Sequence, residues 1–138
     1  MQKKETNQLK NSREYTLIVQ KYIEPLLFQG RKFDIRMWAI WAKNQLWWYK
    51  EGYLRTSSKE FNLTSTSRFV HLTNDAVQIN NEDYGKHEPA NKLSFAEFER
   101  YLEKEQGPNC CRNHFSYIYE QMRDLTVKLF TICKDQLQ

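Results

Sequence analysis

Hydrophobic and polar side chains alternate along residues 32–41, which is the pattern of a β-strand. In an extended chain one face would carry Phe33, Ile35, Met37, Ala39 and Trp41, and the other Lys32, Asp34, Arg36 and Trp38. The first face suits a core. The second carries a cation, an anion and a cation, which would cost several kcal/mol per ion if they were dry and unpaired. We therefore interpret the charged face as a site for a polyanion such as a nucleotide triphosphate.

Further strands are predicted on both sides of this segment. Residues 15–23 are rich in β-branched and aromatic side chains and are followed by Pro25, and residues 46–50 and 53–56 are short apolar runs. Polar residues at 43–45 and the Glu51-Gly52 pair predict the turns between them. These elements together predict an antiparallel meander, followed by a loop over residues 57–67 and by a short apolar segment at 68–74.

The last third of the chain changes to a helical period. Ser94 and Glu97 form a capping box before the apolar face of Phe95, Phe98 and Leu102, and Gly107-Pro108 would end that helix. A second amphipathic helix is predicted from about Cys111 to the end of the chain. The fold class is therefore α+β, with an antiparallel sheet followed by two C-terminal helices.

Length and composition narrow the possibilities. We expect a polar head at residues 1–14 and one domain over residues 15–138. Lys and Arg number 21 against 17 Asp and Glu, so the net charge of +4 suits acidic partners. We expect no membrane partner, because no apolar run approaches the roughly 18 residues that a span needs. Three cysteines, two of them adjacent, favour a reducing, cytoplasmic location over a disulfide framework.

The sequence contains residues of two other kinds of site. The four tryptophans could stack on nucleic-acid bases, but core packing is the better reading, so no nucleic-acid partner is expected. The Cys110-Cys111-x-x-His114 run could suggest zinc, but a tetrahedral site needs a fourth ligand, and adjacent cysteines chelate poorly. No metal ligand is therefore assigned.

Four segments, in this order and spacing, resemble the tubulin tyrosine ligase and tubulin tyrosine ligase-like family of ATP-grasp enzymes. They are Gln20-Lys-Tyr-Ile23, Gly30-Arg-Lys-Phe-Asp-Ile-Arg36, Glu51-Gly-Tyr-Leu-Arg-Thr56 and Arg68-Phe-Val-His-Leu-Thr-Asn74. The likeness covers nearly all of the chain after about residue 16. It implies a partial ATP-grasp domain from an enzyme that ligates glutamate, glycine or tyrosine to tubulin through an acyl phosphate.

The resemblance also implies roles for particular residues. Gln20, Lys21, Tyr22 and Ile23 are similar to the segment that contacts adenine. Lys32 and Asp34 look like nucleotide contacts, Asp34 towards the ribose. Arg36 and Arg55 resemble the catalytic arginines near the terminal phosphate and the acceptor carboxylate, while His71, Thr73 and Asn74 lie in the loop that closes on the phosphate. Physically, a site that holds a triphosphate and carboxylates needs several fixed cations.

The family also requires Mg²⁺, and its Asp and Glu-x-Asn ligands are expected downstream of this chain. We therefore expect the chain alone to be inactive as a ligase, and a partner chain or a longer polypeptide to cover its exposed sheet edge. The alternative is a catalytically dead structural module that binds tubulin or an axonemal partner. Either reading places the protein on the cytoskeleton, with the acidic tails of tubulin or microtubules as its partner and the cilium or axoneme as a possible site.

Overall fold

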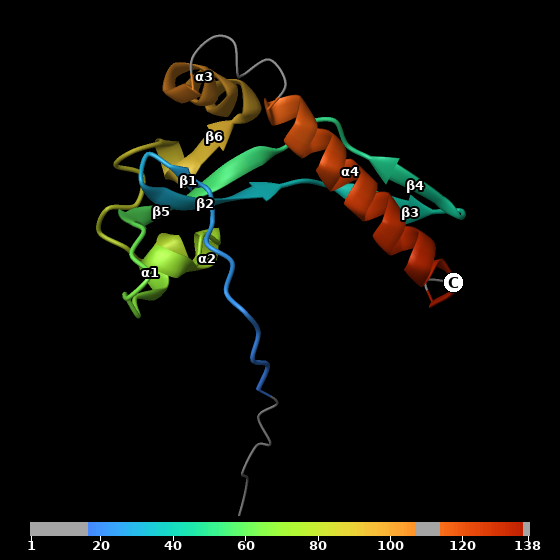
Figure 1. The fold of residues 1–138 in the computed structure, drawn as a ribbon, viewed down its shortest axis with the longest axis horizontal. Helices are drawn as coiled ribbons and strands as arrows, with labels where there is room; N and C mark the ends of the chain where they lie inside the picture. The colour runs from blue at the N-terminus through green and yellow to red at the C-terminus, as the bar shows by residue number, and fades with distance from the viewer. Residues whose placement is uncertain (1–16, 107–113, 137–138) are drawn as a thin grey trace, which may run out of the picture.

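One long, bent β-hairpin organises the computed structural model, which describes residues 17–106 and 114–136 (Figure 1). The outgoing arm contains β2 (Arg31–Arg36) and β3 (Ala39–Ala42), and the returning arm contains β4 (Gln45–Trp48) and β5 (Tyr53–Glu60). β2 pairs with β5 and β3 pairs with β4, both antiparallel. Between the two pairs, the Tyr49 amide donates to the Trp38 carbonyl oxygen at 3.0 Å. The predicted strand over residues 32–41 is therefore present, but it is interrupted at residues 37–38.

The tip of the hairpin is the turn predicted at residues 43–45. Lys43 and Asn44 have φ of 50° and 59°, and positive φ at both central residues is the requirement of the two-residue type I′ turn. The second predicted turn, at Glu51-Gly52, is wrong, because the chain continues in the same arm from β4 to β5. The meander is therefore replaced by one hairpin with a bend.

Gly52 has a different role from the one that the sequence suggested. A Cβ atom at this position would overlap the Arg36 carbonyl oxygen and the Met37 sulfur, and would lie 2.7 Å from Cζ of Phe95. The glycine therefore allows the returning arm to pass close to β2 and to helix α3, and it does not reverse the chain.

The main sheet has four strands in the order β1-β2-β5-β6. β1 (Leu27–Phe28) and β6 (Lys92–Ser94) were not predicted, because each is too short to show a period of its own. β5 extends to Glu60, so the loop predicted over residues 57–67 begins only at residue 61. A register irregularity opposite residues 31–33 interrupts the β2–β5 pairing, and Thr56, Ser57 and Ser58 are all buried there.

The strand predicted over residues 15–23 is wrong where the structure describes it. Residues 17–26 have no regular structure, and Tyr15 and Thr16 lie outside the described residues. Leu17, Ile18 and Val19 are 86%, 82% and 97% exposed. β-branched side chains favour an extended backbone, but a strand needs a neighbour to hydrogen-bond, and no strand of the described sheet pairs with this segment.

Helices follow the sheet in chain order. The apolar segment at 68–74 forms the short helix α1 (Arg68–His71), and α2 (Asp75–Gln78) comes next. After the 3₁₀ turn η1 (Pro89–Asn91) and β6 come α3 (Phe95–Gln106), α4 (His114–Cys133) and the 3₁₀ turn η3 (Lys134–Gln136). The two predicted C-terminal helices are thus confirmed, and the expected stop at Gly107-Pro108 lies outside the described residues.

The capping box at the start of α3 is also confirmed. The Glu97 amide donates to Ser94 Oγ at 3.3 Å, and the Ser94 amide donates to Glu97 Oε2 at 2.7 Å. These bonds satisfy two backbone donors that would otherwise lack a partner at the helix end.

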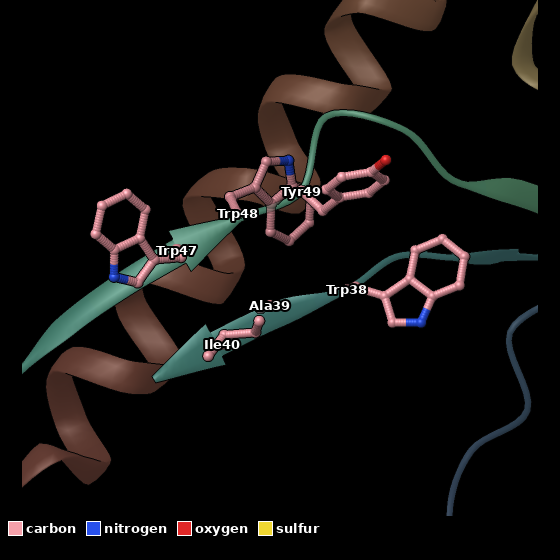
Figure 2. Close-up of a pocket in the computed structure, with 6 residues that line it drawn as sticks. All are labelled: Trp38, Ala39, Ile40, Trp47, Trp48 and Tyr49. Carbon is pink, nitrogen blue, oxygen red and sulfur yellow. The ribbon is translucent and has the colours of Figure 1, made fainter. Parts of the chain in front are cut away.

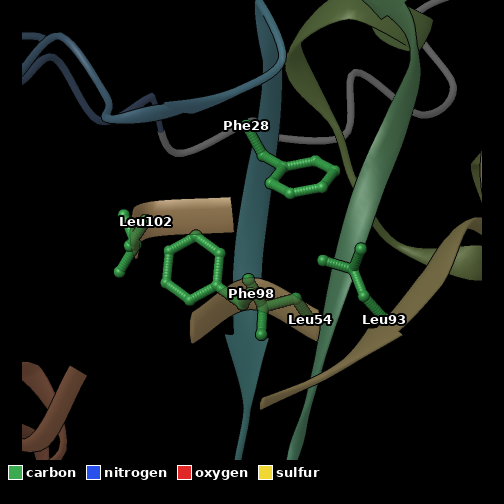
Figure 3. Packing of buried hydrophobic residues seen from close by; sticks show 5 residues of the cluster. All are labelled: Phe28, Leu54, Leu93, Phe98 and Leu102. Carbon is green, nitrogen blue, oxygen red and sulfur yellow. The ribbon is translucent and has the colours of Figure 1, made fainter. Parts of the chain in front are cut away.

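The hydrophobic core lies between the sheet and α3. Figure 3 shows side chains from β1, β5, β6 and α3 converging there: Phe28, Leu54, Leu93, Phe98 and Leu102. Phe33 and Ile35 of β2 pack against this cluster, and the rings of Phe33 and Phe98 lie 5.0 Å apart. The predicted alternation is therefore confirmed for Phe33 and Ile35, whereas Arg31, at the start of β2, is buried beside the Phe28 ring.

A buried polar network lies at the other end of β5. Arg31 is 2% exposed, and its Nη1 donates to Glu88 Oε2 at 2.9 Å and to the Ser57 carbonyl at 3.2 Å. The Thr56 hydroxyl donates to Glu88 Oε2 at 2.8 Å. Asn91 Nδ2 donates to the Thr56 carbonyl at 3.0 Å. This network attaches the loop before β6 to the centre of the sheet.

Gln78 extends the same network to the short helices. Its Oε1 accepts from the Ser58 amide at 2.9 Å, and its Nε2 donates to the Phe69 carbonyl at 3.2 Å. Within the described part of the chain, no buried side-chain nitrogen or oxygen lacks a hydrogen-bond partner. Complete pairing of this kind is what makes a buried polar core tolerable.

α4 covers one side of the β3–β4 ribbon (Figure 1). The Trp48 Nε1 donates to the Tyr119 hydroxyl at 2.9 Å, and the rings of Trp41 and Phe130 stack at 5.8 Å. No helix in the described residues is long and apolar enough to cross a membrane.

Replacing Arg31 by Met tests the buried network. We expect the free energy of unfolding, measured by urea denaturation, to fall by about 3–5 kcal/mol, because Glu88 is left buried without its cation. Arg31→Met combined with Glu88→Gln should recover much of the loss, since no uncompensated charge then remains. Arg100→Met, which removes an exposed arginine of α3, is the matched control. A loss in Arg31→Met no larger than in the control would contradict the account.

Candidate functional site

The charged face of the sheet brings together side chains from three strands. β2 contributes Lys32, Asp34 and Arg36, β5 contributes Arg55, and β6 contributes Lys92. The strand register places Asp34 opposite Arg55, and Arg55 opposite Lys92. Asp34, Arg55 and Lys92 therefore form one row of charges across the sheet, and Lys32 and Arg36 lie beside it on β2.

Asp34 and Arg55 form a two-pronged ion pair at the start of this row. Arg55 Nε donates to Asp34 Oδ1 at 2.9 Å, and Arg55 Nη2 donates to Asp34 Oδ2. The hydrogen bond that Arg55 donates to Asp34 is the largest cause of a raised pKa at Arg55. Both side chains keep some exposure, 21% for Arg55 and 38% for Asp34, so the pair still borders solvent. Such a fork fixes the guanidinium plane while leaving an edge for a further anion.

Lys92 and Asp75 form the other end of the row. Lys92 Nζ lies 3.3 Å from Asp75 Oδ2 and 5.9 Å from the centre of the Tyr53 ring. The Tyr84 hydroxyl donates to Asp75 Oδ1 at 2.6 Å. This hydrogen bond is the first cause of a lowered pKa at Asp75, with Lys92 and Arg55 adding to it, and it also raises the pKa of Tyr84.

The segment predicted to contact adenine lies at one margin of this face. Tyr22 is brought close to β2, with Lys32 Nζ 5.7 Å from the centre of its ring. Gln20, Lys21 and Ile23 are exposed and belong to no helix or strand. The structure thus connects Tyr22 with Lys32, and it leaves the other three side chains open to solvent.

Thr73 and Asn74 lie in the turn between α1 and α2. Thr73 is buried, whereas Asn74 is exposed and precedes α2 without a capping bond from its side chain. Asp75, the next residue, joins this turn to Lys92. His71 Nε2 lies 2.6 Å from the Ser65 carbonyl oxygen, so this side chain is held by a hydrogen bond within its own segment.

A groove of about 450 Å³ runs beside the charged row. Asp34, Arg36 and Arg55 line it from the sheet, and α4 contributes Met122, Leu125 and Thr126. Arg36 is exposed. Arg55 is paired with Asp34, but no carboxylate of the described residues pairs with Arg36. The groove therefore combines one paired and one open arginine with an apolar wall.

The β3–β4 ribbon carries a second surface, which is aromatic. Figure 2 shows the residues that line it: Trp38, Ala39, Ile40, Trp47, Trp48 and Tyr49. The expectation that all four tryptophans pack in a core holds for Trp41 and Trp48, which contact α4, but is wrong for Trp38 and Trp47, which are 42% and 61% exposed. A two-stranded ribbon has two faces, and α4 covers one of them.

Other candidate sites gain no support. Among residues 17–106 and 114–136, no group of three or more His, Cys, Asp or Glu side chains could hold a metal ion. Cys110 and Cys111 of the Cys-Cys-x-x-His run lie outside the described residues. Cys133 is a half-buried free thiol.

Sequence reasoning missed Asp75, Tyr84 and Lys92. Lys92 lies in a three-residue strand, and Asp75 and Tyr84 lie in polar segments without a clear period. Their proximity to Arg55 depends on the β5–β6 register, which leaves no local signal in the sequence. The Asn74-Asp75 pair at the start of α2 is typical of a helix start and could have been noticed.

Comparison with known proteins shows the family of the chain. A model of the "Tubulin-tyrosine ligase family" matches residues 2–136. Tubulin glycylase 3B of Tetrahymena thermophila is 34% identical over 91% of this chain, and human protein monoglycylase TTLL8 is 36% identical over 92%. Bovine probable tubulin polyglutamylase TTLL9 is 36% identical over 72%. The matched regions make up 11%, 16% and 22% of those three relatives.

The pKa of Asp75 offers a direct test of the row. Because the pKa of Asp75 is lowered in the folded chain, its ionised carboxylate stabilises the folded state at pH values above its ordinary pKa of 3.8. This stabilisation is lost as the pH falls through the lowered pKa. Tyr84→Phe removes the main cause, so the pKa of Asp75 should rise towards its ordinary value. The measurement is an NMR titration of the carboxyl carbons, with Tyr117→Phe, an exposed tyrosine of α4, as control. An unchanged Asp75 titration in Tyr84→Phe would refute the assignment.

Proposed function

Because the chain belongs to the tubulin-tyrosine ligase family, we propose that its charged sheet face is part of the nucleotide- and acceptor-binding site of an ATP-dependent ligase that adds an amino acid to tubulin. The observation that carries the proposal is the row of charges on one face of β2, β5 and β6. Arg36 and Arg55 are its proposed catalytic residues. Tyr22, Lys32 and Asp34 are its proposed nucleotide contacts, together with Gln20, Lys21, Ile23, Thr73 and Asn74.

The residues of this face fit a triphosphate. Lys32, Arg36, Arg55 and Lys92 face two carboxylates, Asp34 and Asp75, so cations are in excess. Each charge-assisted hydrogen bond to an anion contributes about 1.5–3 kcal/mol, and arginine matches phosphate and carboxylate with two parallel donors. Lys32 beside the Tyr22 ring would place a cation next to a flat surface suited to a base.

ATP would supply the phosphoryl group that activates a carboxylate as an acyl phosphate. The role proposed for this chain is binding and charge neutralisation. In this proposal Arg36, which is exposed at the groove, contacts a terminal phosphate, and Arg55, which is hydrogen-bonded to Asp34, orients a carboxylate. Asp34 can still accept a hydrogen bond from a ribose hydroxyl, because each carboxylate oxygen has two acceptor positions.

The carboxylates of this face already have cation partners. Asp34 is bound by Arg55, and Asp75 is bound by Lys92 and Tyr84. We therefore propose that the Mg²⁺ which the family uses is held by residues other than these. The ATP-grasp architecture itself remains part of the proposal, because a four-stranded sheet and its helices form only a section of such a domain.

Three relatives named above are a tubulin glycylase, a protein monoglycylase and a probable tubulin polyglutamylase. We propose glycine or glutamate as the amino acid that is added, and the acidic tail of tubulin as the acceptor. The chain's net charge of +4 suits that partner, and the binding should weaken as salt rises. Such a partner would place the protein on the cytoskeleton, including microtubules of the cilium or axoneme.

A second candidate function is favoured by the aromatic surface. Trp38, Ile40, Trp47 and Tyr49 are exposed on one face of the ribbon, where they could contact a protein partner. On this reading the chain is a module that binds tubulin or an axonemal partner without nucleotide. The two candidates differ in whether ATP binds.

Calorimetric titration with ATP, in the presence and absence of Mg²⁺, separates the candidates. We expect measurable binding to the 138-residue chain, and about tenfold weaker binding in Arg36→Ala, because one charge-assisted contact is lost. Arg100→Ala, on the exposed side of α3, should bind like the unmodified chain.

Heat indistinguishable from dilution in the unmodified chain would reject the nucleotide site and favour the binding module. Equal affinity in Arg36→Ala and Arg100→Ala would reject the role of Arg36 alone.

We also expect no ligation by the chain alone. Supplied with tubulin, ATP, Mg²⁺ and radiolabelled glycine or glutamate, the chain should incorporate no more label than a reaction without ATP. A full-length glycylase run in parallel with radiolabelled glycine should incorporate label. Label incorporated by the chain alone would contradict this expectation.

A further inference from the structure

We propose that Arg55 and Lys92 form a two-cation subsite for one oxyanion, either a phosphoryl group or a carboxylate, and that Asp75 competes with this anion for Lys92. The inference rests on the proposed function in one respect, because it takes Arg55 to be a residue of the nucleotide- and acceptor-binding site. It adds Lys92 as a further binding residue and Asp75 as the group that controls it.

The register supplies the first argument. Arg55 and Lys92 are directly opposite each other on β5 and β6. Directly opposed residues of an antiparallel pair have Cβ atoms about 4.5–5.5 Å apart, and like charges at that distance destabilise a sheet. An oxyanion bound between the two side chains would relieve this repulsion by contacting both cations.

The flanking carboxylates supply the second argument. Arg55 pairs with Asp34, and Lys92 pairs with Asp75. Both Asp75 and Asp34 contribute to the electrostatic environment of Arg55. Asp75, which pairs with Lys92, therefore acts on both cations of the proposed subsite.

The two ion pairs differ in how firmly they are made. Asp34 binds Arg55 through two parallel hydrogen bonds, whereas Lys92 meets Asp75 through one contact of 3.3 Å. Lys92 and Asp75 are 38% and 44% exposed in their side chains. Exposed ion pairs with one long contact are weak, so Lys92 can be redirected to a ligand at little cost. Tyr84, which donates to the other oxygen of Asp75, would keep that carboxylate in place when Lys92 leaves.

Inorganic pyrophosphate is the first probe, because it has neither ribose nor base and so tests the subsite separately from the nucleotide site. By calorimetry on the 138-residue chain, Lys92→Gln should weaken pyrophosphate binding about tenfold, and Lys92→Arg should retain it. Lys86→Gln is the matched control, because Lys86 also pairs with an aspartate, Asp83, but lies in a loop away from the row.

Asp75→Asn should have the opposite effect and tighten pyrophosphate binding several-fold, because Lys92 is then released while the Asn side chain can still accept from Tyr84. A merely structural role for Lys92 would not produce opposite signs in Lys92→Gln and Asp75→Asn. Circular dichroism and melting temperature of each variant identify any loss of folding. If Asp75→Asn unfolds, the affinities of Lys92→Gln, Lys92→Arg and Lys86→Gln for pyrophosphate still show whether Lys92 binds the anion.

A peptide of consecutive glutamates is the second probe, and it distinguishes the two sources of oxyanion. Stronger dependence on Lys92 for the peptide than for pyrophosphate assigns the subsite to a carboxylate, and the reverse assigns it to a phosphoryl group. Equal binding of both probes to Lys92→Gln and Lys86→Gln would overturn the proposal, as would absence of binding to the unmodified chain. Loss of ATP binding in Arg36→Ala with no effect of Lys92→Gln would overturn the subsite and leave the proposed function standing.

Discussion

The antiparallel pairing of β2 with β5 is the constraint on which the rest of the structure depends. Because side chains alternate along a strand, this one register directs Phe33, Ile35 and Leu54 into the core and Asp34 and Arg55 to the opposite face. A shift by one residue would turn either Asp34 or Arg55 towards the core. The hydrophobic core and the charged row are therefore two consequences of the same hydrogen-bonded pairing, and the free energy of burying the apolar face also fixes the site.

The buried polar network extends this constraint to segments that lack regular structure. Arg31 and Glu88 join β2 to the loop before β6, and Gln78 joins β5 to α2. An ion pair of this kind is not strong evidence for stability, since its desolvation offsets much of its attraction. It does specify geometry, because the donors of Arg31 must meet Glu88 and the Ser57 carbonyl oxygen at the same time. Through it, β6 and the start of α2 are held where Lys92 and Asp75 meet.

The parts of the fold that the sequence predicted are those with a local cause. The alternation of β2, the turn at Lys43-Asn44 and the capping box at Ser94 each depend on a few neighbouring residues, and each is present. The predicted roles of Arg36 and Arg55 came from resemblance to a family, and the structure places both beside one groove. Asp34 was expected on the same face, but its bond to Arg55 could not be read from the β2 pattern alone.

The failures have non-local causes. Residues 17–23 have the composition of a strand but no partner strand in the described part of the chain, and Gly52 looks like a turn residue but serves a close contact between distant segments. Arg31 has the same sequence character as Lys32, yet it is buried because Glu88, 57 positions later, meets it. Trp38 and Trp47 are exposed because the ribbon has one helix for two faces. Each of these outcomes depends on which segments meet in space.

The register of β2 against β5 can be measured directly by NMR. The account predicts nuclear Overhauser effects between backbone protons of Asp34 and Arg55, of Ile35 and Leu54, and of Arg55 and Lys92 in the folded chain. Effects that instead join Asp34 to Leu54 or to Thr56 as its direct partner would mean a register shifted by one residue. That result would turn Arg55 or Asp34 into the core and contradict the charged row on which the proposed site is built.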